Sequence, residues 1–240
     1  MGVIISDTSQ DETVMVPGIL KGIVFDLDGT LIHSRIDFPK MKRRMIDIFE
    51  ANGVPQGILS TTETNVFIFE KAERAWDEKG KPEHERERVR AKLEETMNQV
   101  ELEAVQLIEE VEGAAYAIRG LKEAGYRLAV LTRSHRAYAI EALKKVGIQQ
   151  YFDLILGRNE TPKPKPYAEA LEHTAELMGL SVDELLFVGD HQIDYTSALN
   201  ARCNFIGVRT GRRGDASWFN NIPDVLIDSV RDLPGYLADR

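Results

Sequence analysis

Two aspartates separated by one residue stand at the end of the first strongly apolar segment of the sequence. They are Asp26 and Asp28, and Gly29 and Thr30 follow them directly. Residues two apart in an extended chain point to the same side, so both carboxyl groups can face one bound group. Carboxylates held close together in a cleft of low dielectric repel each other strongly. A pair with this spacing therefore suits a site for one bound group, and the repulsion between its carboxylates has to be offset.

Further polar residues follow three later apolar segments, and they are Thr132-Arg133-Ser134, Lys163, and Asp190 with Asp194. Ligands of an open parallel sheet bind at the carboxyl ends of its strands, so we expect these residues to converge at one edge. A hard divalent cation with oxygen ligands offsets the repulsion among the carboxylates, and Mg²⁺ is the usual choice. A lysine beside them indicates an anionic substrate, most naturally a phosphate. Gly29 and Gly189 would let the backbone approach the bound group closely.

The elements that must position these residues are indicated by short apolar runs that alternate with amphipathic segments. The runs are near-continuously apolar, as strands buried on both faces should be, and they cover residues 22–27, 126–131, 152–156, 185–189, 204–208 and 225–229. Helices are predicted over 112–124, 135–146 and 166–178, and each is followed by a glycine that suits a helix end. This alternation predicts the α/β class, with a doubly wound, Rossmann-like parallel sheet.

The segment from residue 33 to 110 has no convincing strand and is predicted to be helical. Asp37 can cap a helix over 38–51, and Ser60 with Glu63 forms a capping-box pattern for a helix over 60–78. Pro82 opens a long third helix, whose apolar residues recur every three or four positions as far as Val111. The expected organisation is a tail (1–17), a core (18–32 and 111–240) and an inserted helical domain (33–110).

Composition limits the possible classes of function. The chain has 240 residues, a formal net charge of −9 and a sequence pI near 5.2, so it is not expected to bind nucleic acid or an anionic membrane. Cys203 is the single cysteine, which excludes an internal disulfide and a zinc site made of several cysteines. The first residues do not have the pattern of a signal peptide, so a cytoplasmic protein is expected.

The ordered residues D26-L-D-G-T30, Thr132, K163-P-x-P and G189-D190-x-x-x-D194 resemble the four motifs of the haloacid dehalogenase superfamily. The helical segment between the first two motifs looks like the type-1 cap of that superfamily, and the most similar subgroup is the phosphoglycolate phosphatase-like one. Members that cleave carbon–halogen bonds lack the second aspartate of the first motif. Because Asp28 is present, the resemblance implies phosphoryl transfer.

The resemblance also implies a role for each motif residue. Asp26 would be the nucleophile, and Asp28 would first protonate the leaving group and then deprotonate water. Thr132 would hydrogen-bond the phosphoryl oxygens, while Lys163 would neutralise the nucleophile and the transferred group; Lys165 is expected to be solvated. The resemblance also implies two sets of binding residues. Those at or beside Mg²⁺ are Asp26, Asp28 (through its backbone carbonyl), Asp190 and Asp194. Those at the substrate are Gly29, Thr30, Arg133 and Ser134.

Simpler interpretations and departures from the family pattern stand beside these roles. Thr132, Asp190 and Asp194 could each cap the helix that follows it. Arg133 stands where an asparagine is common, and Arg202 where the fourth motif often continues to a glycine.

The sequence therefore predicts a Mg²⁺-dependent phosphatase that acts on a small phosphorylated metabolite, with phosphoglycolate as the best single candidate substrate. A phosphomutase of the same superfamily, or a non-catalytic protein that binds a phosphorylated ligand, remain as alternatives. The chain is expected to be a monomer or a homodimer.

Overall fold

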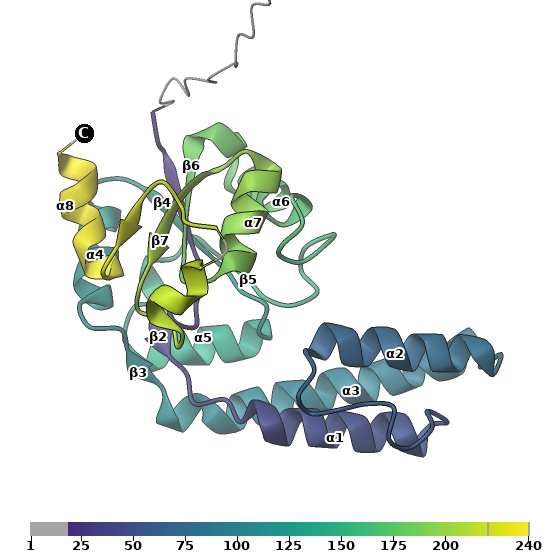
Figure 1. Ribbon diagram of the computed structural model, residues 1–240. Helices are drawn as coiled ribbons and strands as arrows, with labels where there is room; N and C mark the ends of the chain where they lie inside the picture. The colour runs from purple at the N-terminus through teal and green to yellow at the C-terminus, as the bar shows by residue number, and fades with distance from the viewer. Residues whose placement is uncertain (1–18, 220, 240) are drawn as a thin grey trace, which may run out of the picture.

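The apolar runs pair as one parallel sheet of six strands in the order β5-β4-β1-β6-β7-β8. The computed structural model describes residues 19–219 and 221–239, so the predicted tail at 1–17 lies outside the described residues. The strands are β1 (Gly22–Phe25), β4 (Arg127–Leu131), β5 (Leu154–Leu156), β6 (Leu185–Gly189), β7 (Asn204–Val208) and β8 (Leu226–Ile227). β1 lies in the middle of the sheet (Figure 1). Asp26 directly follows the carboxyl end of this strand.

Helices cover both faces of this sheet, as the predicted doubly wound architecture requires. They are α4 (Ala114–Glu123), α5 (Arg136–Lys145), α6 (Glu169–Met178), α7 (Gln192–Ala201) and α8 (Leu233–Ala238). Ile23 and Phe25 point into a core shared with α4, α5 and α8, whereas Val24 points into a second core shared with α6 and α7. This alternation along β1 places apolar side chains on both faces, which is why the run is continuously apolar. The predicted fold class is confirmed.

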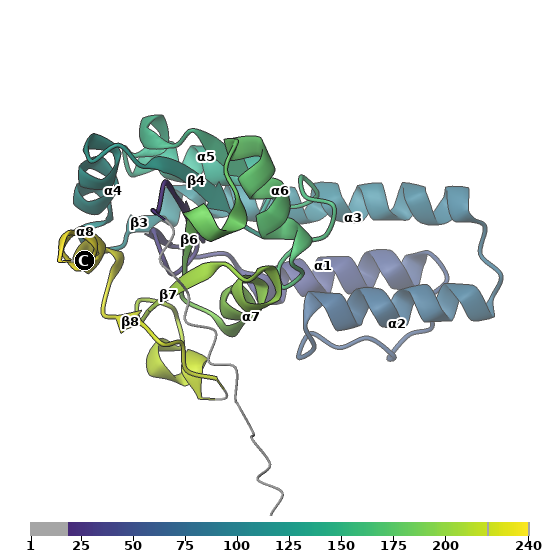
Figure 2. The ribbon, with the colours of Figure 1, turned by 90° about the horizontal axis from the view of Figure 1, so that it is seen from above.

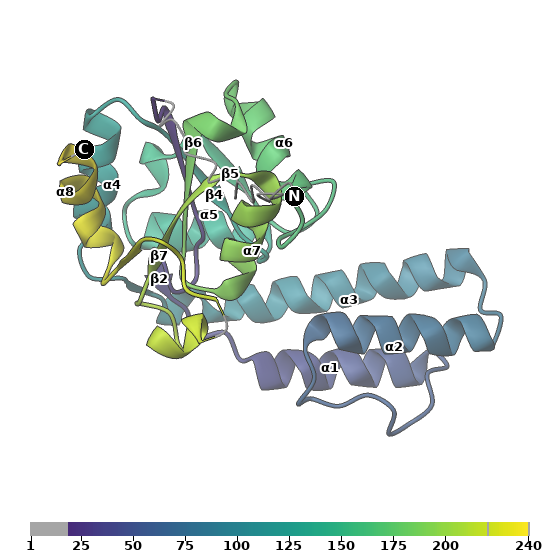
Figure 3. The same cartoon turned by 45° about the horizontal axis from the view of Figure 1, so that its top comes forward.

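Three long helices form an insertion between β1 and β4, and we call residues 38–104 the helical insertion. They are α1 (Phe38–Ala51), α2 (Asn65–Glu78) and α3 (Glu83–Ala104), and they lie beside one another away from the sheet (Figures 1 and 2). Phe49 and Trp76 are fully buried between the helices, with ring centroids 5.4 Å apart. The end of α3 nearest the core packs against α5 (Figure 3).

Two helix boundaries and one small sheet differ from the sequence-based expectations. α2 begins at Asn65 rather than near Ser60, because Thr64 accepts a hydrogen bond from the backbone N–H of Phe67 and caps the helix there. α3 ends at Ala104 rather than continuing to Val111. The chain then turns back through η1 (Val105–Leu107) into β3 (Glu109–Glu110), which pairs antiparallel with β2 (Ile32–His33). Strands of two residues are too short to leave a periodic pattern.

None of the described helices combines the length and the apolar character that are needed to cross a membrane.

Arg202 ends α7 with a left-handed backbone, at a φ of 57°. A residue with a Cβ atom pays about 1–2 kcal/mol for this conformation, whereas glycine does not. We expect Arg202→Gly to raise the free energy of unfolding by about 1 kcal/mol, measured by chemical denaturation. Arg202→Ala is the matched control because it keeps the Cβ atom. Equal stability of the glycine and alanine variants would contradict backbone strain at this position.

Candidate active site

Three carboxyl groups from separate parts of the chain meet at the carboxyl end of the sheet. Asp26 follows β1, Asp190 follows β6 and Asp194 lies in the first turn of α7. Their carboxylate oxygens lie within 4.8 Å of one another, and each residue is at most 8% exposed. Carboxylates from distant parts of the sequence therefore form a compact acidic cluster, as the convergence of parallel strand ends at one edge of the sheet predicts.

Glycine residues make room for this cluster. A Cβ atom on Gly189 would lie 2.6 Å from the Cβ of Asp194, and one on Gly211 would lie 2.0 Å from Oδ2 of Asp190. Gly29, at a φ of 93°, likewise lies against the Asp190 carboxyl group. These glycines therefore let the backbone approach neighbouring carboxyl groups, whereas the predicted close approach of Gly29 and Gly189 to a bound group stays a prediction.

One lysine lies within the cluster and offsets part of its charge, and it is Lys165 rather than Lys163. The ammonium group of Lys165 donates 2.6 Å hydrogen bonds to Oδ1 of Asp26 and to Oδ1 of Asp194, and its side chain is only 3% exposed. The side chain of Lys163 is 55% exposed and pairs with Glu169 at 2.6 Å. The expectation that Lys163 enters the site and Lys165 is solvated is therefore wrong. Both lysines precede a proline, so the local pattern K163-P-K-P cannot distinguish them; the path of the loop does.

The charges of the cluster do not balance. Three carboxylates face one ammonium group. Burial, followed by the nearby charges of Asp26 and Asp194, raises the pKa of Asp190 to about 9. Burial also raises the pKa of Asp26 to about 6, although Lys165 opposes this shift. A divalent cation bound by oxygen ligands would stabilise the ionised form of these buried carboxyl groups. The donor set therefore fits Mg²⁺.

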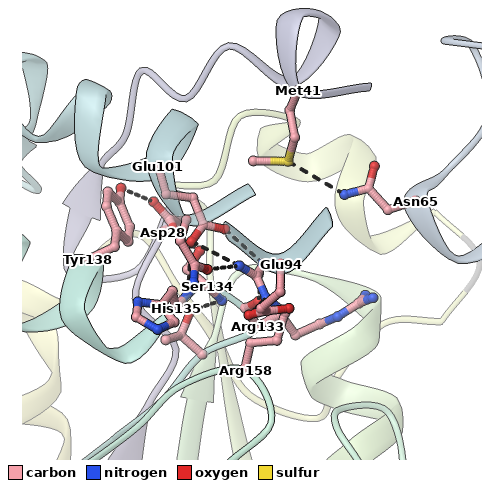
Figure 4. A network of polar contacts seen from close by, with 12 residues as sticks. Asp28, Met41, Asn65, Glu94, Glu101, Arg133, Ser134, His135, Tyr138 and Arg158 are labelled. Carbon is pink, nitrogen blue, oxygen red and sulfur yellow. Dashed lines mark hydrogen bonds and ion pairs between the residues drawn. The ribbon is translucent and has the colours of Figure 1, made fainter. Parts of the chain in front are cut away.

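The fourth carboxyl group, that of Asp28, lies apart from this cluster. Its Oδ1 accepts a hydrogen bond from the phenol of Tyr138 at 3.1 Å, and its Oδ2 accepts one from the hydroxyl of Ser134 at 3.3 Å (Figure 4). Burial, followed by the charge of Asp26, raises the pKa of Asp28 to about 6. Asp28 can therefore exchange a proton near neutral pH. An exposed aspartate has a lower pKa and donates a proton poorly at that pH.

Comparison with known proteins bears directly on this site. Residues 23–208 match the family model described as haloacid dehalogenase-like hydrolase. The chain belongs to this family. The matched span includes the acidic cluster, Asp28 and Lys165. The family and the hydrolase class that the motifs predict are thereby confirmed.

Two curated relatives of this haloacid dehalogenase-like hydrolase are phosphoglycolate phosphatases. The protein of Neisseria meningitidis is 37% identical over 117 residues, which are 47% of this chain and 49% of that protein. The match therefore spans about half the length of the Neisseria relative. The protein of Escherichia coli (strain K12) is 26% identical over 237 residues, covering 89% of this chain and 91% of that protein. The predicted resemblance to phosphoglycolate phosphatases is confirmed.

Solved structures show the same fold. The crystal structure of a predicted phosphoglycolate phosphatase from Haemophilus somnus 129pt has a TM-score of 0.63 and 24% identity, covering 91% of this chain and 98% of that chain. A predicted phosphatase from Clostridium acetobutylicum has a TM-score of 0.62 and 19% identity, covering 93% of this chain and 100% of that chain. Because both sequence identities are below 25%, these structures show a shared fold and nothing more.

Residues 132–134, at and directly after the second motif, lie in different environments. Thr132 is buried directly after β4, and its hydroxyl accepts a hydrogen bond from the backbone N–H of Ser134. It does not cap α5, because the side chain of His135 caps that helix by accepting from the N–H of Ala137. Arg133 is exposed beside the site. Ser134 is the member that contacts a predicted catalytic group, Asp28.

Thr30 and Asp194 are two further residues to which the sequence assigned roles. Thr30 is fully buried, and its hydroxyl has no hydrogen-bond partner among the described residues. The side chain has no exposed surface in this structure, and the substrate contact of Thr30 stays a prediction. Asp194 both caps α7, by accepting from the backbone N–H of His191, and holds Lys165. The capping and the site interpretations of Asp194 are thus compatible.

Residues outside the motifs also contribute to the site. Tyr138 and Gly211 are examples, and sequence reasoning did not select either of them. Tyr138 has no signal of its own, because an aromatic residue on an amphipathic helix ordinarily predicts core packing. Thr210 donates a 2.6 Å hydrogen bond to the backbone carbonyl of Gly29, so the loop after β7 also supports the first motif.

Proposed function

We propose that this haloacid dehalogenase-like hydrolase is a Mg²⁺-dependent phosphatase that hydrolyses a small phosphomonoester, with phosphoglycolate as the best single candidate. The observation that carries the proposal is the Lys165 ammonium group bridging Asp26 and Asp194, beside Asp190. This arrangement presents a carboxylate nucleophile next to fixed positive charge, as attack on an anionic phosphoryl group requires. We expect the protein to act in the cytoplasm as a monomer or homodimer.

In the first half of the reaction, an Oδ atom of Asp26 attacks phosphorus. The bond from phosphorus to the ester oxygen breaks, an aspartyl-phosphate forms, and Asp28 donates its proton to the departing alkoxide. Lys165 holds Asp26 in place by its 2.6 Å hydrogen bond and offsets charge on the transferred group. The raised pKa of Asp28, about 6, makes its protonated form available for this step.

In the second half, Asp28 accepts a proton from the water molecule that attacks the phosphorus of the intermediate. Phosphate leaves, and the Asp26 carboxylate is restored. Mg²⁺, when bound, would neutralise charge on the phosphoryl oxygens. We assign Asp26 and Asp190 as its carboxylate ligands, together with the backbone carbonyl of Asp28. Asp194 is assigned to orient Lys165, because one of its oxygens is already bonded to that ammonium group.

We assign the helical insertion, within the predicted 33–110 domain, as a cap that limits access of bulk water to the site. α3 supports this role because its core-facing end contacts α5, the helix that carries Tyr138. Phosphoglycolate is favoured among small phosphomonoesters because the relatives from Neisseria and Escherichia are named phosphoglycolate phosphatases.

Phosphate release from a panel of phosphomonoesters tests the proposal. We expect release with Mg²⁺, highest from phosphoglycolate, and a loss of at least about 100-fold with EDTA that added Mg²⁺ reverses. The panel would also contain sugar phosphates, nucleoside monophosphates and p-nitrophenyl phosphate. Protein carrying Asp26→Asn, purified in parallel, controls for contaminating phosphatases. An isomerised product without free phosphate would indicate the phosphomutase instead. Mg²⁺-dependent binding without any turnover would indicate a non-catalytic protein.

A further inference from the structure

The carboxyl group of Asp28 is held from both sides by hydroxyl groups. Tyr138 donates to Oδ1 and Ser134 donates to Oδ2, and both donors lie about 110 residues away along the chain. Figure 4 shows the two side chains converging on Asp28 from α5 and from the turn that precedes it. A carboxylate bonded at both oxygens has little freedom to rotate. These two hydroxyls, together with that of Ser34, which also hydrogen-bonds the carboxyl group, therefore set the orientation of the proposed acid and base.

Tyr138 is suited to a fixed role. Its side chain is fully buried in the core beneath α5, so neither the ring nor the hydroxyl can turn toward solvent. Its hydroxyl donates to Oδ1 of Asp28 at 3.1 Å. A buried phenol needs a hydrogen-bond partner, and Asp28 is that partner here.

The second donor, Ser134, lies in a turn that α3 of the helical insertion holds in place. Glu101 of α3 is 2% exposed, and its Oε2 accepts a 2.9 Å hydrogen bond from the backbone N–H of His135. Its Oε1 accepts a 2.9 Å hydrogen bond from the guanidinium group of Arg158. Arg158 in turn donates from its backbone N–H to the carbonyl of Ser134 at 2.8 Å.

Glu94 provides an internal comparison for Glu101. It also lies on α3 and also accepts from Arg158, at 3.0 Å. Unlike Glu101, it has no hydrogen bond to the turn at residues 133–135 among the described contacts. The two glutamates thus share one partner, Arg158, and differ in their contact with the turn that carries Ser134.

Resting on the proposed function, we propose that Tyr138 and Ser134 are positioning residues that orient Asp28 for proton transfer to the leaving group, with Glu101 fixing the turn. Correct placement of a general acid contributes about 10²–10⁴-fold to such a step. Loss of either hydroxyl leaves the carboxyl group present but less firmly oriented. Part of that contribution is then lost, and only for leaving groups that need a proton.

The test compares two substrates by their leaving groups. Phosphoglycolate, or the best alkyl phosphomonoester of the panel, releases an alkoxide that must be protonated, whereas p-nitrophenyl phosphate releases a stable phenolate. The quantity measured is kcat/KM, which reports the steps up to departure of the leaving group. We expect Tyr138→Phe to lower kcat/KM for the alkyl substrate by about 10–100-fold and for p-nitrophenyl phosphate by less than about 3-fold.

Four further variants sharpen the comparison. Ser134→Ala should show the same selectivity and covers the case in which Tyr138→Phe does not fold. Glu101→Gln should show it more weakly, whereas Glu94→Gln should not. Tyr116→Phe, at a tyrosine that is 72% exposed, is the control for loss of a phenol hydroxyl and should change neither value.

The outcomes are distinct. Equal losses for both substrates would assign the hydroxyls a structural role and overturn the proposal, as would unchanged values for both substrates. If the wild-type enzyme releases phosphate from neither substrate, the proposed function itself fails. Wild-type activity with an unselective Tyr138→Phe variant overturns the positioning role alone.

Discussion

Replacing Asp26 with asparagine is expected to lower kcat by at least about 10⁴-fold, to the limit of detection. Asparagine has nearly the same size, but its amide oxygen carries no negative charge and cannot form a stable acyl phosphate. The expected loss is the largest of any single substitution, because each half of the reaction passes through a bond to this side chain. Steady-state phosphate release measures the effect.

A direct measurement of the covalent intermediate separates loss of the nucleophile from loss of folding. Rapid acid quenching during turnover, followed by intact-protein mass spectrometry, should show a phosphorylated wild-type chain and no phosphorylated Asp26→Asn chain. The thermal unfolding midpoint of the variant should stay within a few degrees of the wild type, since one of three mutually repelling carboxylates is removed along with a partner of Lys165. Turnover near the wild-type rate in the variant would rule out the aspartyl-phosphate mechanism.

Replacing Lys165 with methionine is the second substitution with a very large expected effect. Methionine retains much of the length and apolar surface of the lysine but removes the ammonium group that joins Asp26 to Asp194. We expect kcat to fall by about 10³-fold or more, because fixed charge beside the nucleophile and the phosphoryl group is lost. Phosphate release with saturating Mg²⁺ measures this effect.

Stability should change together with activity at Lys165. Breaking a buried ion pair by removing one partner costs about 3–5 kcal/mol, because the remaining charge is left uncompensated. We therefore expect a lower unfolding midpoint for Lys165→Met in EDTA and partial recovery in Mg²⁺. Binding of a cation to the acidic cluster restores some of the missing positive charge. This recovery is a readout that does not depend on catalysis.

Lys163→Met is the matched control, since it makes the same chemical change two residues earlier in the loop. The Lys163 side chain is 55% exposed and pairs with the partly exposed Glu169, and such pairs contribute about 0–1 kcal/mol. Activity should change by less than about 2-fold and the unfolding midpoint hardly at all. If Lys163→Met were inactive and Lys165→Met active, the loop would have to place the other lysine in the site.

Much of the architecture could be predicted from local patterns. The continuously apolar runs at 22–27, 126–131 and 185–189 predicted strands β1, β4 and β6, respectively, because a strand covered on both faces has no polar face. The predicted helix over 38–51 has the same bounds as α1, and Asp37 caps it by accepting from the N–H of Lys40 at 2.8 Å. These features depend on neighbours within one or two turns.

The same local information placed most of the acidic site. Asp26, Asp190 and Asp194 each stand just after a strand or in the first turn of the following helix, and parallel strands bring their carboxyl ends to one edge. Residue type, spacing and strand direction were sufficient to predict that these carboxylates meet. The pattern of D26-L-D-G-T30 also singled out Asp28 without any structural information.

Only the tertiary structure decided which lysine and which hydroxyls complete the site. Lys165 reaches Asp26 across 139 residues, and Tyr138 reaches Asp28 across 110. Lys163 and Lys165 have the same residue type and the same following residue, so their difference lies wholly in how the loop after β5 packs over the sheet. Local sequence determines the elements and their polar ends, whereas contacts between distant segments depend on the packed arrangement of all of them.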